Sequence, residues 1–222
     1  MKHELVITKD GSSSIFLADL DEHYHSIHGA IQESLHVFIN AGFKQMFNNQ
    51  EVISILEIGF GTGLNTLLTC LESLTIQHKI EYTAIEKFPL TANIYSLLNY
   101  CNHLQHQQCT AFFKEINNCS WNESIAINEK FTLLKLNQDV QNIAFSNQFD
   151  IIYFDAFAPS AQPELWTNSI FKSMHQALKK EGVLVTYCAK GIVKRTLKEV
   201  GFIVETIPGP VGKREMTRAW KK

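Results

Sequence analysis

The stretch from Val52 to Leu74 constrains the fold of this chain more than any other. Its first seven residues, VISILEI, form an apolar run, GFGTG follows, and LNTLLTCLESL then places apolar residues at helical spacing. Glycines between a strand and a helix allow positive φ angles and let a ligand approach the backbone closely. The stretch therefore predicts a buried strand, a ligand-binding turn and a helix in succession.

The same alternation continues along the chain. Strands are expected at 80–86, 149–155 and 182–188, and helices at 90–100, 168–180 and 191–200. Such alternation requires right-handed crossovers and gives a parallel sheet with helices on both faces. The closing runs FIVETI and EMTRAWK are joined by a short turn, so they must pair antiparallel. The prediction is an α/β protein with a doubly wound, mostly parallel sheet and an antiparallel C-terminal strand.

The first 50 residues differ from this pattern. LVITKDGSSSIFL is typical of a β-hairpin, and a helix is expected from about Gly29 to Phe47. We therefore expect residues 1–50 to form a hairpin and helix appended to a ligand-binding domain of residues 51–222. With 222 residues, of which 45% are hydrophobic, the chain is long enough for one buried core and below the size at which domains usually split.

The spacing of the glycines narrows the choice of ligand. A dinucleotide-binding turn would have its third glycine where this chain has Leu64, and no Lys-Ser or Lys-Thr pair follows to form a phosphate-binding loop. Glu86 ends the second strand, 23 positions beyond Gly63, where such folds place a carboxylate that accepts both ribose hydroxyls. These features favour a ribose-bearing cofactor. In the alternative interpretation, the glycines only permit a tight turn and Glu86 pairs with Lys87 in solvent.

A second acid, Asp155, ends the apolar run that begins at Phe149 and precedes AFAPSAQPELW. The carboxyl end of a parallel strand lies at the edge of the sheet where ligands bind. Asp155 is therefore a candidate for contact with a substrate. The alternative is a loop acid that caps the next helix.

Charge is distributed unevenly along the chain, although the net charge is only −2. Residues 190–222 contain nine Lys or Arg and three Glu, a local charge of +6, so the first 189 residues carry −8. A basic segment on an acidic body favours local binding to a phosphate backbone. A solvated helix face with a charged terminus is the alternative.

Other classes of protein fit the composition poorly. The five cysteines are scattered and form no CxxC pair, so we expect them to be reduced and structural. The first residues lack the apolar stretch of a signal peptide, and no segment approaches the roughly 20 apolar residues of a membrane span. We expect a cytoplasmic protein without a membrane partner. The histidines of HYHSIH, His23, His25 and His28, suggest metal ligation, but we favour polar contacts to a substrate and expect no metal.

Several motifs together resemble a known family. EIGFGTG, from Glu57 to Gly63, is similar to the first motif of the class I S-adenosyl-L-methionine-dependent methyltransferases, and the strand order from Val52 onward fits their Rossmann-like sheet. More narrowly, DEHYHSIHGAIQE, DAFAP, PELW, YCAKG and PGPVGKREM resemble the tRNA wobble-uridine methyltransferases called MnmD and the methyltransferase half of MnmC. The resemblance implies S-adenosyl-L-methionine as cofactor and methylation of the amine of 5-aminomethyl(-2-thio)uridine at the wobble position of tRNA.

The resemblance also implies roles for individual residues. The cofactor would be bound at Glu57, Gly59, Phe60, Gly61, Thr62, Gly63 and Asn65 around its methionine part, at Glu86 on the ribose, and at Lys87, Phe88 and Asp139 around the adenine. The family usually has Gly where this chain has Gln138. Asp155, the catalytic candidate, would also contact the cofactor, because it would face the transferred methyl group. Substrate contacts are expected from Tyr24, His25, Ser26, Glu33, Phe157 and Pro159, and contacts to anticodon-stem phosphates from Lys190, Arg195, Lys213 and Arg214.

This chemistry explains a carboxylate at Asp155. A primary amine that behaves like that of lysine has a pKa of about 10.4. It is therefore mostly protonated at neutral pH and cannot attack. A nearby carboxylate can bind the ammonium, align the nitrogen with the methyl donor, and take up or relay the proton as attack proceeds.

Two alternative functions share the fold. A spermidine-synthase-like aminopropyltransferase has the same glycine turn, but a basic C-terminal third would disfavour its free polyamine substrates. A non-catalytic tRNA-binding module would keep only the fold. The bifunctional relatives carry a further flavin-dependent oxidase domain, for which this chain has no room. We therefore expect a separate enzyme or route to supply the aminomethyl substrate.

Overall fold

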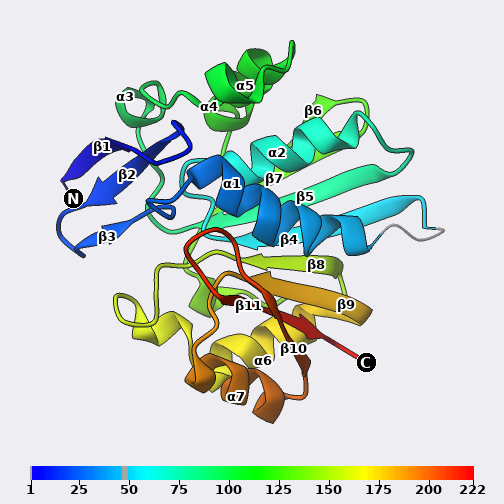
Figure 1. Cartoon of the computed structure of the whole chain (residues 1–222). Helices are drawn as coiled ribbons and strands as arrows, with labels where there is room; N and C mark the ends of the chain where they lie inside the picture. The colour runs from blue at the N-terminus through cyan, green and yellow to red at the C-terminus, as the bar shows by residue number, and fades with distance from the viewer. Residues whose placement is uncertain (1, 47–49) are drawn as a thin grey trace.

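The computed structural model describes residues 2–46 and 50–222. Its main sheet has eight strands in the order β10-β11-β9-β8-β4-β5-β7-β6 (Figure 1). Their bounds are Val52–Ile58 (β4), Lys79–Glu86 (β5), Ser124–Asn128 (β6), Phe131–Asn137 (β7), Phe149–Phe154 (β8), Leu178–Thr186 (β9), Ile203–Pro208 (β10) and Glu215–Trp220 (β11). The five strands from β9 to β7 in this order run parallel, and the outer strands pair antiparallel. The predicted sheet is confirmed.

Helices cover both faces of this sheet. They span Leu64–Ser73 (α2), Ala92–Tyr95 (α3), Tyr100–Leu104 (α4), Cys109–Asn118 (α5), Asn168–Ala177 (α6) and Gly191–Val200 (α7), with 3-10 turns at Val140–Asn142 and Pro163–Leu165. Neighbouring residues of β8 point to opposite faces: Tyr153 joins the buried cluster under α2 and α5, and Phe154 joins the one under α6 and α7. Burial on both faces explains the continuous apolar run of β8. In the described part of the chain, no helix is long and apolar enough to cross a bilayer.

The N-terminal segment forms a small sheet and a helix. Strands β1 (His3–Ile7), β2 (Ser13–Leu17) and β3 (Glu22–His23) pair antiparallel in the order β1-β2-β3, which confirms the predicted hairpin. Helix α1 (Ala30–Ser34) continues as a π-helical stretch, Leu35–Asn40, and a 3-10 turn, Phe43–Gln45. Phe47, where the predicted helix ends, lies outside the described residues. Phe38 packs against Tyr153 of the core with ring centroids 5.2 Å apart. A domain boundary at residue 50 stays a prediction.

Three local predictions are wrong. Residues 90–100 form no single helix, because Asn99 between α3 and α4 bonds to the N-terminal hairpin through its backbone N–H and its side chain. The helix predicted to reach residue 180 ends at Ala177, because β9 begins at the next residue. The cysteines are not all reduced: Cys101 and Cys109 form a disulfide between α4 and α5, with their Cα atoms 5.4 Å apart. The turn between these helices brings the pair within disulfide range, which the spacing alone did not reveal.

Candidate active site

A cavity of about 650 Å³ opens at the carboxyl ends of β4, β5 and β8. Ligands bind at this edge in open α/β sheets. Its lining includes the predicted site residues Tyr24, His25, Ser26, Glu33, Gly59, Phe60, Gly61, Thr62, Asn65, Glu86, Lys87, Phe88, Asp139, Asp155, Phe157 and Lys213. The lining leaves out Glu57, Gly63, Pro159, Lys190, Arg195 and Arg214. Residues from six separate parts of the chain thus meet at one place.

Backbone geometry excludes a side chain at two glycines of the turn, Gly59 and Gly61. Gly59 has a φ of 88°, and a Cβ there would lie 2.6 Å from the carbonyl oxygen of Asp155. A Cβ at Gly61, with φ 51°, would lie 3.2 Å from the Tyr24 ring. Glycine is therefore needed both for the conformation of the turn and for the close approach of its neighbours.

Asn65 bridges two carboxylates beside this turn. Its Nδ2 donates to Glu57 Oε1 at 3.0 Å and to Asp155 Oδ2 at 2.8 Å. Glu57 is completely buried behind Asn65 and accepts a further hydrogen bond from Thr66 Oγ1 at 2.8 Å. Burial raises the pKa of Glu57 to about 8, although the bonds from Thr66 and Asn65 oppose the rise. Glu57 therefore supports the cavity from behind Asn65.

The Asp155 carboxylate follows β8 and faces the cavity. Asp155 is half-buried and lines the cavity. Burial raises the pKa of Asp155 to about 7; Glu33 adds to the rise, whereas the bond from Asn65 and the charge of Lys213 oppose it. Asp155 can therefore gain and lose a proton near neutral pH.

Glu86 lies at the end of β5, on the opposite side of the glycine turn. It accepts hydrogen bonds from the backbone N–H of Gly61, at 3.1 Å, and of Phe88, at 2.8 Å. Burial raises the pKa of Glu86, and these backbone bonds oppose the rise. Lys87 pairs with Asp139, with 2.7 Å between Nζ and Oδ2, and this bond lowers the pKa of Asp139. The Lys87 ammonium thus pairs with Asp139 and not with Glu86, as the alternative interpretation had required.

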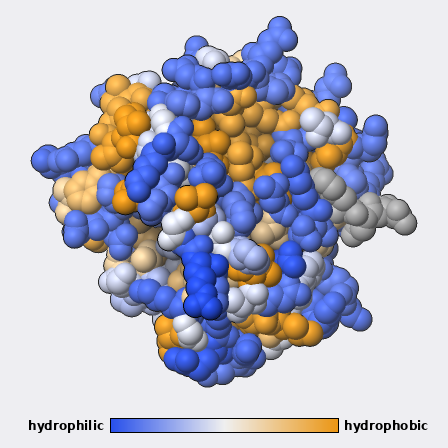
Figure 2. Space-filling view, in the orientation of Figure 1, coloured by the Kyte–Doolittle hydropathy of each residue, from blue (hydrophilic) through white to orange (hydrophobic). Residues whose placement is uncertain are grey.

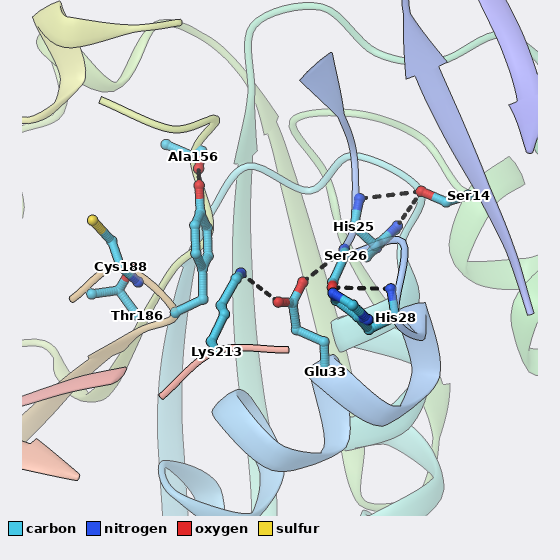
Figure 3. A network of polar contacts seen from close by, with 10 residues as sticks. Ser14, His25, Ser26, His28, Glu33, Ala156, Thr186, Cys188 and Lys213 are labelled. Atoms are coloured by element: carbon cyan, nitrogen blue, oxygen red, sulfur yellow. Dashed lines mark hydrogen bonds and ion pairs between the residues drawn. The ribbon is translucent and has the colours of Figure 1, made fainter. Parts of the chain in front are cut away.

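A chain of polar contacts crosses another wall of the cavity (Figure 3). Glu33 accepts hydrogen bonds from the backbone N–H of Ser26, at 3.0 Å, and from Lys213 Nζ, at 2.5 Å. The Lys213 ammonium also lies 4.0 Å from the centre of the Tyr187 ring. The Tyr187 hydroxyl donates to the carbonyl of Ala156 at 2.8 Å. Tyr187 was not among the predicted site residues. Its position at the start of the YCAKG motif could have indicated it.

The N-terminal segment contributes Tyr24 and His25. The Tyr24 ring meets Phe157 edge to face, with centroids 5.0 Å apart. The backbone N–H of His25 donates to Ser14 Oγ at 3.1 Å, and its Nε2 lies 3.5 Å from Thr62 Oγ1 in the glycine turn. Burial lowers the pKa of His25 to about 4, so this imidazole is neutral at physiological pH. Within residues 2–46 and 50–222, no group of three or more His, Cys, Asp or Glu is placed to hold a metal ion.

Three of the four predicted phosphate-binding cations line a second cavity of about 500 Å³. Lys190, Lys213 and Arg214 line it, together with Pro159, and Lys213 lines both cavities. Arg195 lines neither and lies exposed on α7. Figure 2 shows strongly hydrophilic side chains at the turn between β10 and β11, which contains Lys213 and Arg214. The structure thus brings three of the four cations together.

Comparison with known proteins decides the family. Residues 100–222, more than half of the chain, match the family described as S-adenosyl-L-methionine-dependent methyltransferase. The chain belongs to this family. Its cofactor is S-adenosyl-L-methionine.

Curated relatives of this methyltransferase are longer proteins. The "tRNA 5-methylaminomethyl-2-thiouridine biosynthesis bifunctional protein MnmC" of Leptospira interrogans is 30% identical over 206 residues, which cover 88% of this chain and 32% of the relative. The protein of the same name from Cupriavidus metallidurans is 28% identical over 230 residues, which cover 97% of this chain and 33% of the relative. The methyltransferase thus spans about a third of the length of these relatives.

Solved structures support the same fold. The crystal structure of MnmC2 from Aquifex aeolicus has a TM-score of 0.81 and 27% identity, and the match covers 100% of this methyltransferase and 70% of that chain. Spermidine synthase from Thermotoga maritima matches with a TM-score of 0.56 and 16% identity, which shows a shared fold alone. The class I methyltransferase fold is therefore confirmed.

The cavity of the methyltransferase fits its cofactor. Asn65 Oδ1 is a buried acceptor without a hydrogen-bond partner in the described part of the chain, and it would accept an N–H of the methionine amine. Glu86 lies where such folds bind the ribose hydroxyls. Phe88, with 51% of its surface exposed, offers an open aromatic face for the adenine. The roles of the individual residues stay predictions.

Proposed function

We propose that this methyltransferase methylates the amine of 5-aminomethyl(-2-thio)uridine at the wobble position of tRNA, giving 5-methylaminomethyl(-2-thio)uridine. The observation that carries this proposal is the Asp155 carboxylate, which faces the cofactor cavity that Glu33 also lines, near enough for the charge of Glu33 to raise its pKa. An acidic wall suits a substrate that arrives as a primary ammonium. The names of the curated relatives support tRNA as the substrate.

The proposed mechanism depends on orientation and on one proton transfer. When bound, S-adenosyl-L-methionine supplies an electrophilic methyl group on a sulfonium. Asn65 bonds to Asp155 Oδ2, so we assign the proton transfer from the substrate amine to Oδ1. With a pKa of about 7, Asp155 would accept the proton that the amine loses and pass it to solvent. Good alignment alone lowers such barriers by up to about 7–11 kcal/mol.

The remaining site residues receive roles by position. Around the cofactor we place Glu57, Gly59, Phe60, Gly61, Thr62, Gly63, Asn65, Glu86, Lys87, Phe88 and Asp139. Around the wobble base we place Tyr24, His25, Ser26, Glu33, Phe157 and Pro159, and along the anticodon stem-loop Lys190, Arg195, Lys213 and Arg214. The proposal includes a cytoplasmic location, where tRNA is found, and a separate route that supplies the aminomethyl group.

The test is mass spectrometry of wobble nucleosides from tRNA that carries 5-aminomethyl-2-thiouridine, after incubation with the protein and S-adenosyl-L-methionine. We expect conversion to the N-methyl nucleoside by the parent and little by an Asp155→Asn variant. Failure to methylate any tRNA, by folded protein that binds the cofactor, would overturn the proposal. Incubation with putrescine and the decarboxylated cofactor tests the aminopropyltransferase alternative. Methyl transfer to tRNA excludes a module that only binds.

A further inference from the structure

The substrate side of the cavity already contains a primary ammonium, that of Lys213. Its Nζ bonds to the Glu33 carboxylate at 2.5 Å and lies 4.0 Å from the centre of the Tyr187 ring. A carboxylate on one side and an aromatic face on the other form an arrangement that binds organic cations. The Glu33 side chain is only 9% exposed and that of Lys213 32%, so water screens the pair weakly. We call the space between Glu33 and Tyr187 the amine subsite.

Both walls of the amine subsite are held without help from Lys213. The second oxygen of Glu33 accepts the Ser26 backbone N–H at 3.0 Å, and the Tyr187 hydroxyl donates to Ala156 O at 2.8 Å. Figure 3 shows Lys213 reaching toward Glu33 from the C-terminal turn, with Ser26 on the other side of Glu33. The subsite therefore keeps its shape when the lysine leaves it.

The side chain of Lys213 and the proposed substrate end in the same chemical group. Each carries a primary ammonium on a methylene carbon, and the subsite shares its cavity with Asp155. We propose that Glu33 and Tyr187 bind the ammonium of the substrate, and that Lys213 fills their site until the substrate displaces it. This inference rests on the proposed function, because it requires a substrate with a primary amine.

The second cavity provides a place for the displaced lysine. Lys213 lines that cavity as well, together with Lys190 and Arg214. A phosphate of bound RNA would compensate the Lys213 charge there, while the substrate ammonium replaces it beside Glu33. Exchanging one ammonium for another leaves no buried charge unpaired, whereas removing Lys213 without a replacement leaves Glu33 uncompensated. Uridine without the aminomethyl group has no ammonium to replace that of Lys213, so it would displace the lysine only at the cost of an unpaired Glu33. The exchange therefore favours aminomethyl uridine over uridine.

The test is calorimetric binding of 5-aminomethyluridine to the protein without cofactor, with uridine as the amine-free control. We expect Lys213→Met to bind 5-aminomethyluridine about tenfold more tightly than the parent, the effect of one freed charge-assisted hydrogen bond. Its affinity for uridine should not change. Adding Glu33→Gln to Lys213→Met should remove the gain. Lys222→Met, which changes a lysine that lines neither cavity and pairs with Glu181, should leave nucleoside binding as in the parent.

A Lys213→Met protein that binds 5-aminomethyluridine no more tightly than the parent would overturn the inference. If that variant does not fold, Lys213→Gln, which keeps a donor to Glu33 without the charge, makes the same comparison. These measurements need no methyl transfer, so they separate the two proposals. If the protein methylates tRNA but Lys213→Met binds 5-aminomethyluridine no more tightly, the proposed function is supported and the amine subsite is wrong.

Discussion

At the scale of single residues, the acids around the cavity differ in what binds them. Glu57 is buried behind Asn65, Glu86 accepts two backbone N–H groups, and Asp139 pairs with Lys87. Each of these acids is thus positioned to hold other groups in place. Asp155 combines a position on the cavity wall with a pKa near neutrality. It is therefore the acid best suited to exchange a proton with a substrate.

We expect Asp155→Asn to lower kcat for methyl transfer by about 10²- to 10⁴-fold, the usual contribution of a general acid or base. Cofactor affinity should change only slightly, because the asparagine can still accept the hydrogen bond from Asn65. For the parent, kcat/KM should rise with pH through about 7, as Asp155 becomes ionised. Initial rates between about pH 5 and pH 9 check both points. A variant that keeps the parent rate would contradict this role.

The same substitution should change the pH dependence of stability. Because folding raises the pKa of Asp155 from 3.8 to about 7, the folded state binds more protons than the unfolded state between these values. Asp155 therefore makes the parent lose stability as the pH rises from about 4 to 7, and this contribution is absent in Asp155→Asn. We expect the variant to be the more stable above pH 7 by an amount on the order of 2–4 kcal/mol, and to lose this advantage below pH 4. Urea unfolding at several pH values measures the difference. If the free energies of unfolding of parent and variant depend on pH in the same way, folding does not raise the pKa of Asp155.

At the scale of elements, local sequence patterns predicted where strands end. They did not predict the features that depend on contacts between distant residues. The glycine turn, Glu86 and Asp155 could be placed because each follows an apolar run. Strand β7 received no such assignment, and its buried Lys135 helps to explain why: the ammonium bonds to Ile116 O and Asn117 O of α5, which makes a charged residue compatible with a core strand. The contact between Glu33 and Lys213 joins positions 180 apart, which no local pattern contains.

The glycine turn should not tolerate a methyl group at its first position. We expect Gly59→Ala to destabilise the protein by about 1–3 kcal/mol and to weaken methyl transfer, because φ is 88° and the new Cβ would press on the Asp155 carbonyl. Thermal unfolding and cofactor titration measure both effects. Gly191→Ala is the matched control: its nearest neighbour is the Arg195 guanidinium at 3.3 Å, which can move. Equal losses in the two variants would show that the turn is not constrained in this way.

The disulfide between α4 and α5 makes a prediction that thiol counting can check. Denatured but unreduced protein should expose three reactive thiols, those of Cys70, Cys119 and Cys188, and reduced protein five. Reduction should lower the free energy of unfolding by about 2–3 kcal/mol, given the sequence separation of eight residues. A Cys101→Ser, Cys109→Ser double variant should not respond to reductant. Five reactive thiols before reduction would show that all five cysteines are reduced, as the sequence analysis expected.

At the scale of the whole molecule, α1 and the turn between β10 and β11, which lie far apart in the sequence, meet beside the cavity. Glu33 of α1 bonds to Lys213 of the last turn, and His36 Nε2 lies 2.9 Å from the carbonyl oxygen of Pro208 at the end of β10. The turn between β10 and β11, with Lys213 and Arg214, is thus fixed next to the cofactor cavity. An acidic body with one basic region should direct an RNA to that region and away from the rest of the surface.

Salt dependence tests this arrangement. Each phosphate contact contributes about 0.7–0.9 to the slope of log K against log salt concentration. We therefore expect Lys190→Ala, Arg214→Ala to lower the slope for tRNA binding by about 1.5, because both cations line the second cavity and the Arg214 side chain is 94% exposed. A control pair, Lys79→Ala, Lys222→Ala, removes the same charge away from both cavities, where these lysines pair with Glu51 and Glu181. Filter binding across a salt series gives the slopes. An equal decrease in both double variants would mean that net charge alone attracts the RNA, and an unchanged slope in the first would remove the second cavity from the binding surface.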